Sequence, residues 1–109
     1  MSEAALIWST FGDEATAREA ANTLLDEGLV VCANLFPDVQ SLYVWRGKKG
    51  EAGECGALFK TAFVLLSQAI ERLEAIHPYQ SPAILGVEAS SVGRATKEWI
   101  SGMSGEAAP

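Results

Sequence analysis

The feature that most constrains the fold is a long extended segment in the middle of the chain. β-Branched and aromatic residues dominate it, and such residues favour strands. The segment contains three strand-like runs, separated by Pro37-Asp38 and by a charged, glycine-rich stretch: LVVCANLF (29–36), VQSLYVW (39–45) and CGALFKTAF (55–63). Together they predict a hairpin from Leu29 to about Phe63 that is too long for a compact sandwich, so its far half must project beyond the rest of the domain.

The interruptions of this segment predict where the chain turns. Pro37-Asp38 indicates a turn or at least a break in the strand. The stretch RGKKGEAGE (46–54) carries glycines at 47, 50 and 53 among charged residues, which predicts a flexible, exposed hairpin tip. Alternation in the run before it places Val39, Ser41, Tyr43 and Trp45 on one face of the ribbon.

The segment before the hairpin predicts a strand followed by a helix. The run AALIWST (4–10) has the length and apolarity of a buried strand. Asp13 is a plausible N-cap, and Ala17, Ala20, Ala21, Leu24 and Leu25 then recur with helical spacing. Gly28 stands where a glycine ends such a helix.

The segment after the hairpin repeats this arrangement in reverse order. Leu66, Ala69, Ile70, Leu73 and Ile76 share one helical face, and Pro78 ends that helix because proline disfavours helical backbone at the residue before it. The run PAILGVEA (82–89) predicts the last strand. Ser90 or Ser91 is the expected cap of a short closing helix, and residues 104–109 are expected to form a flexible tail.

The order β-α-β-β-α-β predicts an α+β fold, the ferredoxin-like sandwich, with both helices on one face of a four-stranded antiparallel sheet. A length of 109 residues fits a single domain, residues 1–109. Apolar residues make up 49% of the chain, and so small a domain cannot bury them all. We expect the surplus, with the exposed edges of the hairpin, to form a subunit interface.

Charge and hydropathy exclude several classes of partner. The net charge is −6, and the basic residues do not cluster beyond Lys48-Lys49, so nucleic acid and anionic membrane surfaces are not expected partners. The apolar runs are far shorter than the ~20 residues of a membrane helix, and the first residues lack the basic region of a secretory signal. We therefore expect a soluble, cytoplasmic protein whose two cysteines stay reduced.

Four motifs in order give the chain a family resemblance over nearly its whole length. They are DEATAREAANTLLDEGLVVCANLFPDVQSLYVWRG (13–47), Glu54-x5-Lys60-Thr61, His77-Pro78-Tyr79-x2-Pro82, and EWI (98–100). With these motifs the chain resembles the CutA divalent-cation tolerance proteins. The resemblance implies a ferredoxin-like homotrimer, a role in tolerance of copper and other divalent metals, and a fold related to the PII signalling proteins.

Metal binding is the first function to test against the residues. Cu(I) prefers thiolate and imidazole ligands, and the candidate ligands are Cys32 and His77. No C-x-x-C or H-x3-H spacing occurs, so a copper or other divalent metal site needs copies of the chain around a symmetry axis. The alternatives are structural: Cys32 as a small core residue, Cys55 as an exposed incidental thiol, and His77 as a cap of the second helix.

A cleft for a small ligand is the second function. Tyr43, Trp45, Glu54, Lys60 and Tyr79 match family positions that resemble a polar and aromatic pocket between subunits. Glu54 and Lys60 share one face of their strand by period two. The alternative for Tyr43 and Trp45 is interface packing.

No catalytic residues are predicted. A Cys-His nucleophilic pair needs the two side chains within hydrogen-bond reach, and no glycine-rich phosphate loop is present. Three functions remain open at this point: a metal-tolerance protein, a PII-like sensor of a small ligand, and a trimeric scaffold that binds neither.

Overall fold

The structure, a computed structural model, describes residues 3–104 of the chain. Its elements follow the predicted order: β1 (Ala4–Phe11), α1 (Glu14–Asp26), β2 (Cys32–Trp45), β3 (Lys48–Ala62), a 3-10 turn (Phe63–Leu65), α2 (Leu66–Ile76), β4 (Ile84–Glu88), α3 (Arg94–Ser101) and a second 3-10 turn (Gly102–Ser104). The predicted tail begins in this last turn, and its residues 105–109 lie outside the described residues.

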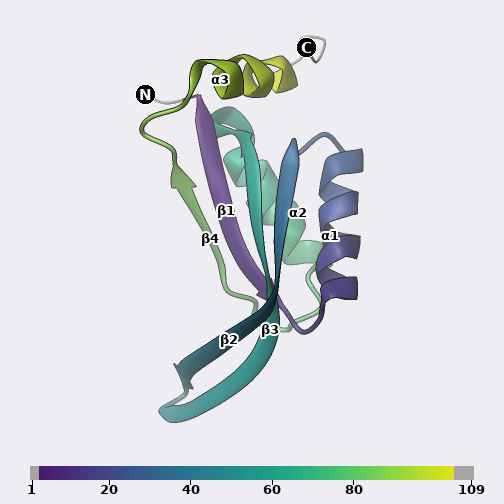
Figure 1. Cartoon of the computed structure of the whole chain (residues 1–109). Coiled ribbons are helices and arrows are strands. Elements are labelled where there is room, and N and C mark those ends of the chain that lie inside the picture. Colours follow the sequence, from purple (N-terminus) through teal and green to yellow (C-terminus); the bar gives the residue numbers. More distant parts are fainter. Residues whose placement is uncertain (1–2, 105–109) are drawn as a thin grey trace.

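The four strands form one sheet in the order β2-β3-β1-β4, with every neighbouring pair antiparallel. Helices α1 and α2 cover one face of this sheet, and α3 lies across its end (Figure 1). The predicted α+β class and antiparallel sheet are therefore confirmed. The core between sheet and helices is built from residues of both layers, including Ile7, Phe11, Ala17, Leu24, Phe59 and Leu73.

Helix α1 is bounded by the two residues that the sequence indicates. The Asp13 carboxylate accepts a hydrogen bond of 2.8 Å from the backbone N–H of Thr16, which satisfies a donor that the first helical turn leaves unpaired. At the other end Gly28 has φ +72°, and the N–H of Leu29 donates to the carbonyl of Leu24 at 2.9 Å. This is the Schellman arrangement that favours glycine at that position.

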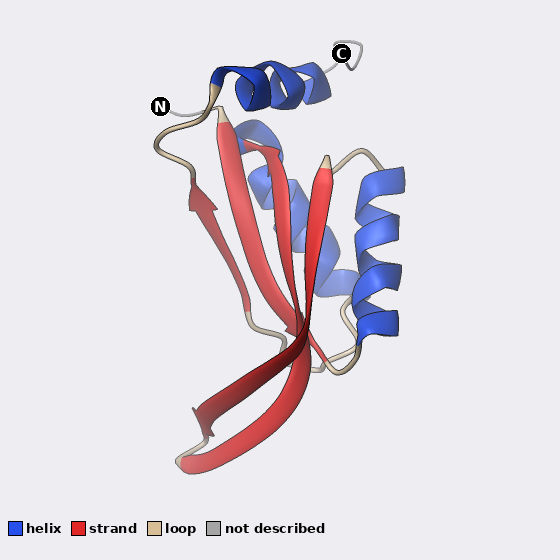
Figure 2. Ribbon diagram, viewed as in Figure 1, coloured by secondary structure: helices blue, strands red, loops and turns tan. Residues whose placement is uncertain are grey.

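Strands β2 and β3 extend as a two-stranded ribbon well beyond the sheet. β1 pairs with β3 only as far as Phe11 and Cys55, whereas β2 and β3 stay paired from Cys32–Lys60 out to Trp45–Lys48. The outer part of this ribbon bends away from the body of the molecule (Figures 1 and 2). The predicted long, projecting hairpin is thus observed.

Two details of the hairpin differ in part from the prediction. Residues 48–54 are strand and not a flexible loop, although none of them is buried, because the turn is confined to Arg46 and Gly47, with φ of 51° and 80°. Positive φ at both central residues is typical of a tight two-residue hairpin turn. Pro37-Asp38 do not turn the chain, but they interrupt the pairing as the weaker alternative predicted: they form a bulge inside β2, with Asp38 at φ 64°.

The closing helix also differs from its prediction at its start. Helix α3 is preceded by Gly93, which makes no side-chain capping bond, so neither Ser90 nor Ser91 is the cap. The helix instead docks by its apolar side: Ile100 is buried with Ala4 and Ala62 at the end of the sheet.

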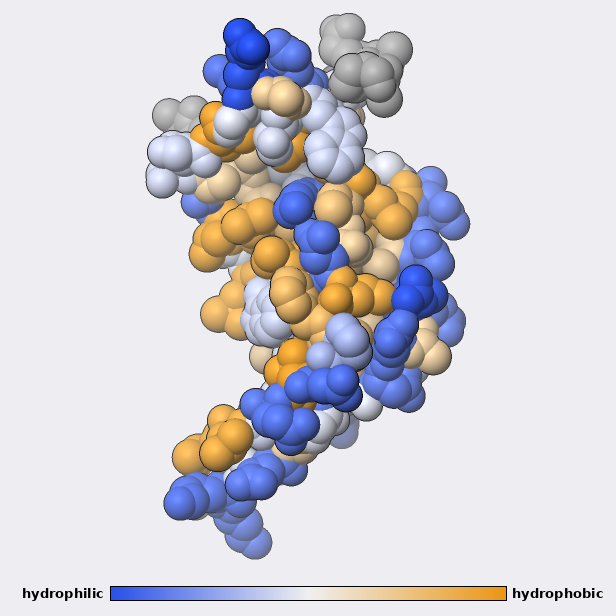
Figure 3. Space-filling model, viewed as in Figure 1, coloured by the Kyte–Doolittle hydropathy of each residue, from blue (hydrophilic) through white to orange (hydrophobic). Residues whose placement is uncertain are grey.

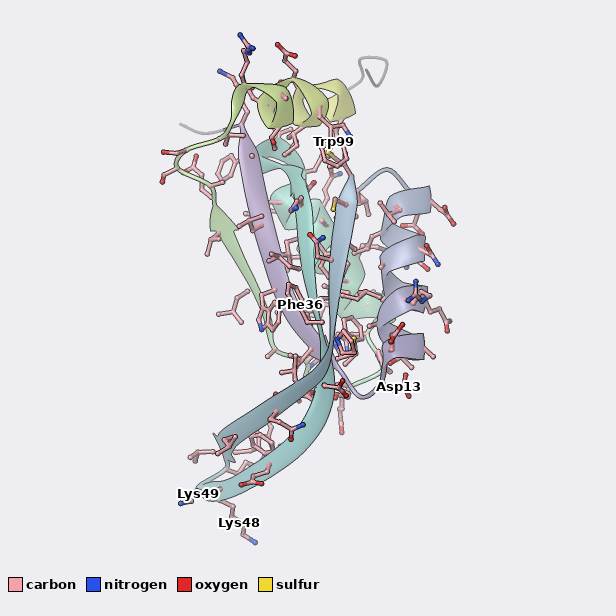
Figure 4. All side chains as sticks on the ribbon, viewed as in Figure 1. Asp13, Phe36, Lys48, Lys49 and Trp99 are labelled. Carbon is pink, nitrogen blue, oxygen red and sulfur yellow. The ribbon has the colours of Figure 1, made fainter. Side chains whose placement is uncertain are left out.

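The face of the sheet opposite α1 and α2 is open and apolar. Gly86 of β4 faces the side chains of Leu66 and Ile70 in α2, so its neighbours Leu85 and Val87 point to the other face, where they are 60% and 54% exposed. Figure 3 shows apolar side chains gathered over this face, and Figure 4 shows Phe36 on it. We call this surface the open sheet face; no helix among the described residues covers it.

Candidate functional site

A groove lies where the ribbon leaves the body of the molecule. Its volume is about 960 Å³, and it is bordered by the ribbon, by β1 and by the segment between α2 and β4. Four of the five predicted cleft residues line it: Tyr43, Trp45, Glu54 and Tyr79. Several further lining residues were not predicted, among them Trp8, Thr10, Ser41, Gln80, Pro82 and Ala83.

Two glycines of β3 give the groove its aromatic walls. A Cβ atom at Gly50 would lie 2.6 Å from the ring of Tyr43, and one at Gly56 would lie 2.3 Å from the ring of Trp8. Each ring therefore lies directly against the β3 backbone, where only glycine leaves room. Glu54 lies between these two glycines, so its carboxylate is flanked by the two rings along the strand.

The Glu54 carboxylate is held in place by hydroxyl groups. Tyr79 Oη donates to Glu54 Oε2 at 2.6 Å. Desolvation alone would raise the pKa of Glu54, but hydrogen bonds from Ser41, Tyr79 and Thr10 outweigh it and lower the pKa below its usual value. Burial, together with the negative charge of Glu54, raises the pKa of Tyr79. The groove thus presents an ionised carboxylate at neutral pH.

His77 holds one wall of the groove in position. Its Nδ1 accepts a hydrogen bond of 3.1 Å from the N–H of Tyr79, which leaves Nε2 as the protonated nitrogen that donates to the carbonyl of Thr10 at 2.9 Å. The imidazole stacks on Phe11 with ring centroids 4.2 Å apart. Burial lowers the pKa of His77. His77 is the C-cap residue of α2, with extended backbone before Pro78, but its ring bonds Thr10 and Tyr79 and not the helix carbonyls that the capping alternative requires.

The two candidate metal ligands lie apart. Across the sheet, Cys32 is paired through Lys60 with Leu6 of β1. His77 bonds Thr10, which is four residues further along β1. Four residues of strand span about 13 Å, so Cys32 and His77 of one chain cannot share a metal ion. Within residues 3–104 no group of three or more His, Cys, Asp or Glu side chains is arranged to hold one.

The thiols differ from the structural expectations as well. Cys32 is only partly buried, on the open sheet face, with its Sγ 3.6 Å from Asn34 Oδ1. Cys32 is therefore not a core residue, which was the structural alternative to metal binding. Cys55, expected to be exposed, is buried against the helix side, 2% exposed, and burial raises the pKa of its thiol. Residue 55 is on that side because it alternates with Ala57 and Phe59, which are also buried against the helices.

Lys60 is the predicted cleft residue that the structure does not bring into the groove. It shares a face of β3 with Glu54, as predicted from period two, but six residues of strand separate them by about 20 Å. Lys60 instead lies on the open sheet face between Leu6 and Cys32.

The sequence signal for the missed residues was weak. Trp8 and Thr10 alternate with buried positions in β1, which indicates the face they occupy, but nothing in the sequence indicates that they border a groove with the ribbon. Among the described residues, no helix is both long enough and apolar enough to cross a membrane.

Comparison with known proteins places this geometry in a family. Residues 5–103 match the family of the CutA1 divalent ion tolerance protein. The divalent-cation tolerance protein CutA of Thermococcus kodakarensis is 35% identical over 98 residues, which cover 90% of this chain and 93% of that protein.

Solved structures agree. The crystal structure of CutA from Xylella fastidiosa matches with a TM-score of 0.88 at 34% identity, covering 94% of this chain and 98% of that one. A periplasmic divalent cation tolerance protein CutA from Archaeoglobus fulgidus matches with a TM-score of 0.85 at 26% identity, covering 92% and 97%. The chain therefore belongs to the CutA1 divalent ion tolerance family.

Proposed function

We propose that this chain acts in the tolerance of divalent cations as a homotrimer that binds copper or another divalent metal ion. The observation that carries the proposal is membership of a family whose relatives are named for divalent-cation tolerance and align with this chain over almost their full length. The predicted cytoplasmic location is part of the proposal, although one structural relative is described as periplasmic.

The exposed apolar surface supports the trimer. The open sheet face leaves Phe36, Leu85 and Val87 exposed, and the ribbon exposes Leu42 and Val44 at 75% and 67%. Contiguous apolar surface of this kind, next to unpaired strand edges, is typical of subunit interfaces. Two further copies of the chain would cover both features.

A metal site, on this proposal, is shared between chains. The residues of one chain do not fit a metal ion held jointly by Cys32 and His77, because of their separation and because both ring nitrogens of His77 already bond within the chain. Cys32 lies on the open sheet face, which the trimer would bring against other copies. Copies of the Cys32 thiolate then supply the soft ligands that Cu(I) prefers.

A titration with Cu(I) under reducing conditions tests the metal part of the proposal. Wild type is compared with Cys32→Ser, His77→Gln and, as a control, the buried thiol variant Cys55→Ser, each checked for oligomeric mass. We expect Cys32→Ser alone to abolish tight binding. Equal affinity in all four proteins, or binding to none, would contradict a thiolate site at Cys32.

A growth assay tests the tolerance part. A bacterial strain made copper-sensitive by deletion of its own relative is complemented with wild type or with Cys32→Ser. We expect wild type to restore growth on copper and Cys32→Ser to fail at equal expression. Failure of wild type itself would contradict the tolerance role.

A second candidate function is recognition of a small ligand, and the groove is the observation that favours it. Its volume lies within the ~300–1,000 Å³ of ligand pockets, and it combines aromatic walls with an ionised carboxylate. We assign no catalytic role: the hydrogen bonds found for the thiols Cys32 and Cys55 go to Asn34 and to the Gly56 carbonyl, and neither goes to His77. A scaffold trimer would bind neither metal nor ligand.

A further inference from the structure

The groove beside the ribbon combines negative charge with exposed aromatic rings. Two carboxylates, those of Glu54 and Glu74, line it, and none of the described residues that line it is Lys or Arg. Glu54 is the better placed of the two, because Tyr79 fixes one of its oxygens at 2.6 Å. A carboxylate has about four acceptor positions, and Ser41, Tyr79 and Thr10 use three of them, so one position remains for a ligand.

The aromatic rings lie on both sides of this carboxylate. Trp8 lies against Gly56 and Tyr43 against Gly50, two and four residues from Glu54 along β3, and Tyr79 contacts Glu54 directly. The faces of such rings carry negative electrostatic potential, which attracts cations. Trp45, further along the ribbon, already shows this attraction, with the Arg46 guanidinium carbon 5.4 Å from its ring centroid.

The donor set does not suit a bare divalent metal ion. Calcium takes about six to eight oxygen ligands, whereas the groove has two carboxylates and no third acidic, His or Cys side chain among its described lining residues. One fixed carboxylate among aromatic faces is instead the arrangement that recognises a substituted ammonium group, whose charge is spread over apolar methyl or methylene groups.

We propose that this groove binds a small organic cation, an amine or quaternary ammonium compound, with Glu54 as its counter-ion and Trp8, Tyr43 and Tyr79 as its aromatic walls. The proposal rests on the second function above, small-ligand recognition, and is independent of metal binding at Cys32. It requires that the copies covering the open sheet face and the ribbon leave this groove free. Tyr79 positions Glu54, and His77 in turn positions Tyr79 through its backbone N–H.

The test uses the full chain and two probes of nearly equal shape: choline, and its uncharged analogue 3,3-dimethyl-1-butanol. Binding is measured by titration calorimetry and by tryptophan fluorescence. We expect saturable binding of choline and binding of the uncharged analogue weaker by roughly tenfold or more, which corresponds to at least about 1.4 kcal/mol.

Variants locate the site. Glu54→Gln keeps an acceptor for Tyr79 but removes the charge, and Tyr43→Leu removes one wall at a half-exposed position; each should weaken choline by about tenfold. Glu51→Gln, on the same strand but outside this groove, is the matched control and should leave choline binding unchanged. Circular dichroism checks that each variant is folded. If Glu54→Gln does not fold, Tyr43→Leu still tests the site.

Three outcomes would overturn the proposal, and they separate it from the function on which it rests. Equal affinity for both probes would retain a ligand groove but refute its selectivity for cations. No binding of either probe would refute both. Binding of choline only to a variant in which Lys48 and Lys49 are changed to Gln would show that the basic end of a neighbouring ribbon fills the groove. The proposal also predicts that the Cys32→Ser variant binds choline as wild type does.

Discussion

The contact between Gly56 and Trp8 makes a sharp prediction for the substitution Gly56→Ala. The added Cβ would lie 2.3, 2.9 and 3.1 Å from three ring carbons of Trp8, all well inside van der Waals contact. The ring cannot simply rotate away, because it packs edge-on against Phe36 with centroids 5.9 Å apart. The strand cannot retreat either, because Cys55 and Ala57 on either side of Gly56 are buried.

The size of the effect follows from these contacts. Forcing a methyl group into a packed site costs about 1–3 kcal/mol, and replacing a strand glycine by alanine returns about 0.5–1 kcal/mol. The difference is a net loss of about 0–2.5 kcal/mol, with a middle value of about 1 kcal/mol, which lowers the Tm of a domain of this size by on the order of 5 °C. The assay is thermal unfolding followed by circular dichroism at one fixed protein concentration, since assembly makes Tm depend on concentration.

Gly53→Ala is the matched control for this prediction. Gly53 lies on the same strand, but a Cβ there meets only the Gln40 side-chain nitrogen, at 3.9 Å. We expect its Tm to equal that of wild type or to rise slightly. If Gly56→Ala and Gly53→Ala unfolded at the same temperature, Trp8 would not lie on the β3 backbone, and the aromatic wall assigned to it would be wrong.

Three further predictions follow from single contacts. Asp13→Ala should lower the Tm, whereas Asp13→Asn should have a Tm close to that of wild type, because the asparagine carbonyl still accepts from the Thr16 N–H. An equal decrease in Tm in both variants would refute a capping role. Thr61→Val should cost about 1–3 kcal/mol in urea unfolding, because Thr61 Oγ1 is buried and donates to the Leu29 carbonyl at 2.6 Å, and Thr61→Ser should restore most of it. Burial lowers the pKa of His77 in the folded protein below its value of 6.5 in the unfolded chain. Its contribution to the free energy of unfolding is therefore complete above pH 6.5 and is lost as the pH falls below that value. The loss of stability in acid should be smaller in His77→Gln than in wild type.

The elements of the fold were predictable where local chemistry decides them. The Asp13 cap, the Gly28 end of α1 and the Pro78 end of α2 each follow from backbone geometry that a few neighbouring residues impose. The four-stranded antiparallel sheet follows from the order of these elements. Such features need no knowledge of distant contacts.

The errors occurred where a distant residue decides the conformation. Gly50 and Gly53 resemble loop glycines, yet they continue β3, and the space at Gly50 is used by the ring of Tyr43 from the opposite strand. Cys55 was expected to be exposed because it adjoins this predicted tip, but alternation with Ala57 and Phe59 turns it toward the helices. A glycine that accommodates a ring and a glycine that permits a turn cannot be told apart by spacing alone.

The candidate site was predictable in part. Tyr43, Trp45, Glu54 and Tyr79 do line one groove, as the family motifs suggested. Lys60 lies on the same face of β3 as Glu54 but outside the groove. The alternation of side chains along a strand predicts the face of a residue but not its distance from another residue on that face. The roles of these residues, and of Cys32 and His77, stay predictions.

The mass of the purified protein in solution, measured by light scattering during size-exclusion chromatography at micromolar concentration, tests the central claim most directly. That claim is that the open sheet face and the ribbon are covered by further copies of the chain. It predicts a single species of about three times the protomer mass of 11.6 kDa. A stable species at 11.6 kDa would contradict it.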